Sequence, residues 1–182
     1  MVAGIDEVGR GSIAGPLVAG VVVLPAYHSL ELYDSKSISR KKRNYLNTKI
    51  IDTALAYATG WVTNEEIDEY GLAWSLQEAY IRALTQIPIG INKIILDGNV
   101  NYLSEFGICE TMIGADKSID CVSAASIVAK VSRDNYMIAQ STKYPHYSYE
   151  TNVGYGTVSH LKAINELGLC KLHRKSFCTK YL

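Results

Sequence analysis

The sequence carries no net charge of either sign, because its 18 lysine and arginine residues balance its 18 aspartate and glutamate residues. This balance excludes a globally basic field of the kind that attracts nucleic acids, so a bound polyanion would have to be held by a local patch. The strongest local patch is the basic run from Arg40 to Arg43, with Lys36 shortly before it. Such a run is equally typical of a solvated helix start.

Cysteine is scarce, and its spacing is irregular. The chain has four cysteines, at positions 109, 121, 170 and 178, which form no Cys-x-x-Cys pair and match no zinc-binding spacing. Reduced thiols are therefore expected, as in a cytoplasmic protein. The sequence also lacks a cationic segment before its first apolar stretch and any apolar run near the roughly 18 residues of a membrane span. Neither a signal peptide nor a membrane helix is expected.

What is present is the composition of an ordinary globular protein, with 48% hydrophobic and 20% charged residues in a chain long enough for one well-packed domain. Two apolar segments at 2–8 and 16–24 flank a glycine-rich turn and predict a hairpin. Further strands are predicted at 54–62, 92–99 and 107–114, and helices at 39–52, after residue 63 or 64, at 74–87, from 123 onward and at 158–167. This mixture predicts an α/β fold with a mixed sheet.

Acidic residues stand at two of the predicted strand ends. Asp6 and Glu7 close the first strand, Asp97 closes the strand at 92–99, and Asp116 lies in the loop before the long helix. Ligands bind at the carboxyl ends of strands in open α/β sheets. Oxygen ligands without a histidine or cysteine cluster suit Mg²⁺ or Mn²⁺, and carboxylates with two such ions most often serve in-line phosphoryl transfer.

Simpler interpretations exist for some of these acids. Asp97 precedes a glycine and is typical of a plain turn, Asp120 is a candidate helix cap, and Asp134 is a candidate surface acid. Spacing alone does not separate Asp116 from the last two.

Asp6 and Glu7 give the stronger signal, because acids inside an apolar strand are costly unless something neutralises them. Successive strand residues point to opposite faces, so both acids cannot face one site while the strand stays regular. The glycines that follow, Gly9 and Gly11, would let the backbone turn there or approach a ligand closely.

Several blocks, in this order, strongly resemble type 2 ribonuclease H, the ribonuclease HII family. They are GIDEVGRGSIAGPLVAGVVVL near the start, DSKSIS at 34–39, ILDGN, ADKSIDCVSAASIVAKVSRD at 115–134, and GYGT with HRKSF near the end. The resemblance implies a ribonuclease H-like mixed β-sheet flanked by helices, within a single catalytic domain over residues 1–182. A helical, substrate-binding portion is implied from about residue 140 to 182.

The activity that the resemblance implies is endonucleolytic cleavage of the RNA strand of RNA–DNA hybrids, and cleavage on the 5′ side of single ribonucleotides in duplex DNA. Two ions, Mn²⁺ or Mg²⁺, would assist hydrolysis to a 3′-hydroxyl and a 5′-phosphate, in DNA repair or primer removal. The implied catalytic and metal-binding residues are Asp6, Glu7, Asp97 and Asp116. Asp116 is preferred to Asp120 because it lies seven residues before the SAASI segment, as the family's fourth acid does. Asp6 would end its strand facing the metals, and the turn would bring Glu7 round to the same cluster.

The resemblance also implies a set of substrate-binding residues: Gly9, Arg10, Gly11, Ser35, Lys36, Ser126 and Tyr155. The Gly-Arg-Gly loop would read the ribose 2′-hydroxyl, which both donates and accepts hydrogen bonds. Arg10 would hold the junction phosphate, and Tyr155 would pack on the following deoxyribose. A core position is the alternative for Tyr155, since the chain has 13 tyrosines.

The chain departs from the family pattern at two places. Gly114 stands where the family has a lysine, and Asn152 and Val153 stand where it often has His-Lys. The missing cations would weaken phosphate contacts or shift substrate preference, unless Lys117 or Lys143 compensates.

Other interpretations fit the sequence less well. Ribonuclease HIII is disfavoured, because the chain starts at the catalytic motif. A dinucleotide binder would need Gly-x-Gly-x-x-Gly leading into a helix, which GRGSIAG does not supply. A catalytically silent nucleic-acid-binding protein on the same fold stays open. A monomer is expected, and no clamp-binding motif is seen at the C-terminus.

Overall fold

The computed structural model describes residues 1–32 and 38–181, so the predicted substrate-binding residues Ser35 and Lys36 lie outside the described residues. Its centre is a five-stranded sheet of order β3-β2-β1-β4-β5. The strands are β1 (Val2–Val8), β2 (Leu17–Val23), β3 (Ala56–Val62), β4 (Lys93–Asp97) and β5 (Cys109–Met112). β1 pairs antiparallel with β2 and parallel with β4, so the predicted hairpin and the predicted mixed sheet are both confirmed.

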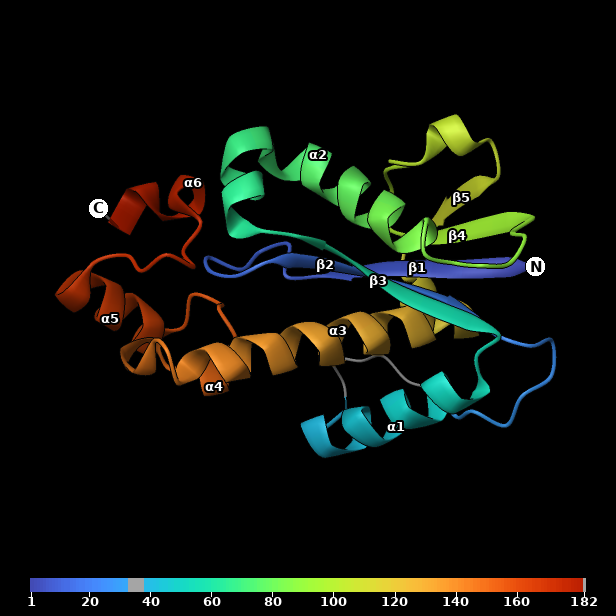
Figure 1. Ribbon diagram of the computed structural model, residues 1–182, viewed down its shortest axis with the longest axis horizontal. Coiled ribbons are helices and arrows are strands. Elements are labelled where there is room, and N and C mark those ends of the chain that lie inside the picture. Colours follow the sequence, from blue (N-terminus) through green and yellow to red (C-terminus); the bar gives the residue numbers. More distant parts are fainter. Residues whose placement is uncertain (33–37, 182) are drawn as a thin grey trace.

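Helices cover both faces of this sheet (Figure 1). They are α1 (Arg40–Thr53), α2 (Asn64–Leu84), α3 (Asp120–Ser141), α4 (Tyr149–Asn152), α5 (Val158–Leu167) and α6 (Lys175–Cys178), with short 3₁₀ turns at Ser104–Phe106, Ala115–Lys117, Pro145–Tyr147 and Thr179–Tyr181. α2 lies on one face and α3 on the other, with α1 outside α3, while α4 to α6 gather at one end of the molecule (Figure 1). The helical C-terminal region is therefore present as expected.

Two glycines let α3 approach the sheet closely. A Cβ atom on Gly4 of β1 would lie 2.2 Å from the backbone carbon of Cys121, and one on Gly20 of β2 would lie 2.3 Å from the carbonyl oxygen of Ala125. Any side chain at either place would push the helix away from the strands. The tight contact brings the first half of α3 against the middle of β1, next to Asp6.

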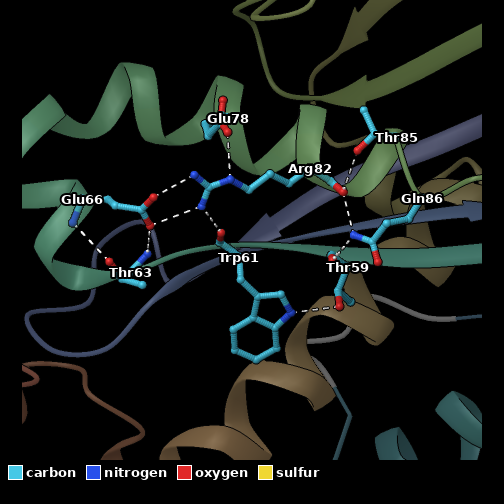
Figure 2. Close-up of polar contacts among 8 residues, drawn as sticks. All are labelled: Thr59, Trp61, Thr63, Glu66, Glu78, Arg82, Thr85 and Gln86. Atoms are coloured by element: carbon cyan, nitrogen blue, oxygen red, sulfur yellow. Dashed lines mark hydrogen bonds and ion pairs between the residues drawn. The ribbon is translucent and has the colours of Figure 1, made fainter.

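Two helices were expected in this region, and α2 does consist of two helical parts, which non-helical backbone at Gly71 separates. The second part ends at Leu84 and not at Pro88 as expected. The kink lies at Gly71, which has a φ of 78°. A residue other than glycine adopts such a positive φ only under strain. Arg82 fastens the two halves together, because its guanidinium lies 2.7 Å from Glu66 before the kink and 2.8 Å from Glu78 after it, and it donates to the Trp61 carbonyl of β3 (Figure 2).

The predicted start of the long helix is wrong. Ser123 was expected as its cap, but α3 begins at Asp120, because the 3₁₀ turn Ala115–Lys117 leads directly into it. Ile119 already donates its N–H to the Ala115 carbonyl. The Ser123 hydroxyl, inside the helix, donates to the carbonyl oxygen of Asp116 and so fixes the turn that carries this acid.

The basic run on α1 is only partly available to a polyanion. Arg43 is buried, donates to the Ile38 carbonyl and lies 3.8 Å from Asp134. Asp134 also accepts a 2.8 Å bond from Lys130, so it is a buried structural acid and not a surface one. No helix in residues 1–32 or 38–181 is long and apolar enough to cross a membrane.

Candidate active site

Three carboxylates meet at one edge of the sheet. Asp6 lies near the carboxyl end of β1, Asp97 ends the neighbouring parallel strand β4, and Asp116 lies in the turn Ala115–Lys117 after β5. One carboxylate oxygen from each lies within 4.8 Å of the others. Asp6 and Asp116 are only 5% and 3% exposed. The cluster is thus a concentrated, largely buried group of acids.

Hydrogen bonds hold the cluster in place from two sides. Asp97 accepts from the N–H of Ala115 at 2.9 Å, which ties the loop bearing Asp116 to the end of β4. Ser126 of α3 hydrogen-bonds the side chain of Asp6. Asp120 takes no part in the cluster, because its side chain is 62% exposed and pairs with His28 at 3.4 Å. Of the acids that spacing left open, the structure therefore brings Asp116 to the cluster.

The electrostatics of the cluster call for a cation. The pKa of Asp6 is raised to about 8, first by burial and then by the negative charges of Glu7 and Asp97. The Ser126 hydroxyl and the N–H of Glu7, which donates to Asp6 at 2.7 Å, lower it only in part. Carboxylate oxygens at these separations, with the pKa of Asp6 raised by burial and by neighbouring negative charge, fit a divalent cation.

Glu7 faces the other side of β1. The expected turn at Glu7 does not occur, because pairing with β2 continues in register to Val8. The Glu7 carboxylate accepts a 2.6 Å bond from the Tyr80 hydroxyl of α2 and lies 3.7 Å from the Arg10 guanidinium. Burial raises the pKa of Glu7, and the charge of Asp97 contributes to the same effect. Glu7 is therefore electrostatically coupled to Asp6 and Asp97 but lies outside the cluster of three acids.

The Gly-Arg-Gly segment forms the exposed turn that follows β1. Gly9 has a φ of 89° and accepts a 3.2 Å bond from the N–H of Ser12. A side chain cannot be accommodated at Gly9, because an added Cβ atom would lie 2.3 Å from the Arg133 side chain. An added Cβ atom at Gly11 would meet open space. Arg10 and Gly11 are exposed, and within the described chain their N–H groups have no hydrogen-bond acceptor. These donors are free to contact a ligand.

Tyr155 lies beside this turn and is half-buried. Its neighbour Gly154 leaves no room for a side chain, because a Cβ would lie 2.4 Å from the Ala14 carbonyl. The ring is 5.5 Å from the Lys130 ammonium and 5.5 Å from the Arg133 guanidinium, measured to its centroid. Tyr155 thus combines a packed position with a partly exposed ring.

Sequence reasoning missed several residues that support the site. Tyr80 lies in the predicted helix 74–87, and nothing in the local sequence signals its contact with Glu7. Arg133 and Arg174 stand inside the recognised blocks, but a buried arginine leaves no signature in one sequence. Asn152, which replaces a family cation, is buried and accepts a 2.8 Å bond from the N–H of Gly154.

Known proteins of one family are similar to this chain over nearly its whole length. The family model for Ribonuclease HII matches residues 3–180. A Ribonuclease HII of Endomicrobium trichonymphae is 43% identical over 177 residues, which are 97% of this chain and 84% of that protein. The resemblance read from the sequence blocks is thereby confirmed.

Solved structures share the fold. The ribonuclease H2 from Pyrococcus horikoshii OT3 superposes with a TM-score of 0.84 at 29% identity, covering 99% of this chain and 96% of that one. Bst-RNase HIII in complex with Mn²⁺ superposes with a TM-score of 0.72 at 19% identity, covering 92% of this chain and 62% of that one. The expected ribonuclease H-like sheet flanked by helices is confirmed.

Proposed function

The chain belongs to the ribonuclease HII family and is a ribonuclease H, and from this premise we propose its substrates and its chemistry. It cleaves the RNA strand of RNA–DNA hybrids and cuts on the 5′ side of single ribonucleotides embedded in duplex DNA. The products carry a 3′-hydroxyl and a 5′-phosphate. The observation that carries this proposal is the convergence of Asp6, Asp97 and Asp116 within 4.8 Å, beside an exposed turn with free N–H groups.

Asp6, Asp97 and Asp116 would hold a divalent ion, Mn²⁺ or Mg²⁺, and Glu7 would complete the carboxylate set for a second. Coupling of Glu7 to both Asp6 and Asp97 supports its inclusion, although its side chain faces α2. When bound, such ions polarise the phosphate and generate the attacking hydroxide. Ser126, which hydrogen-bonds the Asp6 carboxylate, would orient this metal ligand beside the bound substrate.

The turn at Gly9, Arg10 and Gly11 would recognise the ribose. Carbonyls and N–H groups of this turn suit a 2′-hydroxyl, which donates and accepts, and the open space over Gly11 admits a sugar. Arg10, which is exposed, would bind the adjacent phosphate. Tyr155, which is half-buried, would pack on the next deoxyribose.

Such an enzyme would serve ribonucleotide removal in DNA repair, or primer removal, in the cytoplasm. The competing function is binding without cleavage, on the same fold. A duplex with one labelled ribonucleotide distinguishes the two: with Mn²⁺ we expect a single cut on its 5′ side, and with EDTA none. An all-DNA duplex is the matched control. Binding of the ribonucleotide duplex without any cut, in either Mn²⁺ or Mg²⁺, would establish the silent binder.

A further inference from the structure

Two fully buried arginines, from distant parts of the chain, converge on the loop 9–16. Arg133 of α3 and Arg174, just before α6, are both 0% exposed. Arg133 donates to the carbonyls of Pro16 at 2.8 Å and Ala14 at 3.0 Å. Arg174 donates to the carbonyl of Gly15 at 2.9 Å and, at 3.3 Å, to that of Arg10.

Neither guanidinium has a carboxylate partner within ion-pair distance in the described part of the chain. Burial lowers the pKa of both arginines, and the charge of Arg133 helps to lower that of Arg174 to about 9. Two buried guanidinium groups that repel each other and lack an ion-pair partner are a costly way to fill a core. Arg82, by contrast, is about one-third exposed and bonds two carboxylates (Figure 2).

The arginines determine which way the loop presents its backbone. They bind carbonyl groups on the inner side, and the segment 172–174 adds two further bonds, from the N–H of Gly15 to the Leu172 carbonyl and from the N–H of Arg174 to the Ile13 carbonyl. With these groups held inward, the unpartnered N–H groups of Arg10 and Gly11 stay on the outer side of the turn.

His173, which precedes Arg174, is connected through His160 to Tyr155, another of the proposed substrate-binding residues. The N–H of Cys170 donates to Nδ1 of His173 at 2.9 Å, so Nε2 of His173 carries its proton and donates to Nε2 of His160 at 3.0 Å. Nδ1 of His160 then donates to the carbonyl of Tyr155 at 2.8 Å. His173 and Arg174, which are consecutive in the chain, thus connect the Gly-Arg-Gly turn with Tyr155 through hydrogen bonds at either end.

We infer that Arg174, with Arg133 as its counterpart on α3, is a positioning residue that fixes the Gly-Arg-Gly turn in its substrate-reading shape. This inference rests on the proposed function of that turn. Arg174 touches no reacting atom and acts through the backbone of the loop. It does not contribute to the carboxylate cluster, which is held by separate bonds from Ala115, Ser123 and Ser126.

The test is Arg174→Lys, which keeps the charge and removes the two-point hydrogen bonding. Arg82→Lys is the matched control, because Arg82 also joins separate segments but lies away from the turn. For Arg174→Lys we expect KM for a single-ribonucleotide duplex to rise by roughly tenfold or more, with a smaller change in kcat and unchanged Mn²⁺ affinity. Arg82→Lys should lower the melting temperature and leave KM within about twofold of wild type.

A wild-type enzyme that cuts neither the single-ribonucleotide duplex nor an RNA–DNA hybrid would refute the proposed function itself. A wild type that cuts, together with an Arg174→Lys variant of unchanged KM, would overturn only the present inference. If circular dichroism shows Arg174→Lys to be unfolded, Arg133→Lys takes its place with the same expectation. Loss of the fold in both variants would assign the arginines to stability alone and would also overturn the inference.

Discussion

Strand β1 carries two adjacent acids in opposite surroundings. Asp6 faces α3 and joins two other carboxylates, so its burial and its neighbours raise its pKa to about 8. Glu7 faces α2, where the Tyr80 hydroxyl and the Arg10 guanidinium partly satisfy it. Because successive residues of a strand point to opposite faces, Asp6 belongs to the cluster and Glu7 lies outside it. The comparison teaches that proximity in sequence does not make the two acids equivalent.

The largest expected effect separates these two acids directly. Asp6→Asn should lower kcat by roughly 10³-fold or more, because it removes a carboxylate from the group that would hold the metal. Glu7→Gln should cost less, since its partners and its face of the strand differ. Single-turnover cleavage in Mn²⁺ measures both. Equal losses of kcat would contradict the difference between the two acids that their surroundings predict.

The next largest effect is expected for Asp116→Asn, which should lower kcat by several orders of magnitude. Asp120→Asn, at an exposed position, should change kcat only slightly. The two variants make the same chemical change four positions apart. If Asp120→Asn were the inactive one, the cluster would be assigned to the wrong acid.

Gly11→Ala should lower cleavage at a lone ribonucleotide by roughly 10- to 100-fold, and cleavage of a long hybrid less, because a methyl group would occupy the space for the sugar. The fold should not change, since this Cβ meets no protein atom. Arg10→Ala is the control: it should weaken binding to both substrates alike and reduce the salt dependence. Equal losses on both substrates for Gly11→Ala would make the turn merely structural.

Tyr80→Phe addresses the α2 face of β1 and should reduce activity by roughly tenfold, through loss of the hydrogen bond that orients Glu7. Its effect should vanish in the Glu7→Gln background, which a double-mutant cycle measures. Additive losses would contradict a role through Glu7.

The smallest effect concerns stability in metal-free buffer. The folded protein retains a proton on Asp6 up to about pH 8, whereas the unfolded chain loses it near the ordinary aspartate pKa of 3.8. Stability should therefore fall as pH rises from about 4 to 8, and Asp6→Asn should be more stable than wild type at pH 8 by about 2–4 °C or more in melting temperature. Added Mn²⁺ should reverse the order at pH 8. Parallel melting curves for both proteins across this range would contradict the raised pKa.

The parts that could be predicted from sequence depend on local patterns. The hairpin of β1 and β2, the cap of α1 at Ser39 and the position of Asp97 at a strand end follow from alternation, capping and turn chemistry. The α/β fold with a mixed sheet followed from the mixture of predicted strands and helices. The family and the choice of Asp116 came from the order of the blocks, because spacing alone did not choose Asp116.

The parts that could not be predicted depend on contacts between distant segments. The long helix begins before Ser123 because a 3₁₀ turn feeds it, and Glu7 stays in the strand because β2 keeps pairing beyond it. Arg133 and Arg174 both donate hydrogen bonds to the loop 9–16, although they are 41 residues apart in the sequence. No local sequence pattern predicts such a contact between distant segments.

The most direct test of the central claim is a crystal structure with Mn²⁺, in which anomalous scattering locates the ions. The account predicts an ion held by Asp6, Asp97 and Asp116 at the edge of the sheet, with Asp120 and Asp134 free of metal. An ion at Asp120, or full Mn²⁺ occupancy in the Asp6→Asn variant with unchanged cleavage, would contradict it.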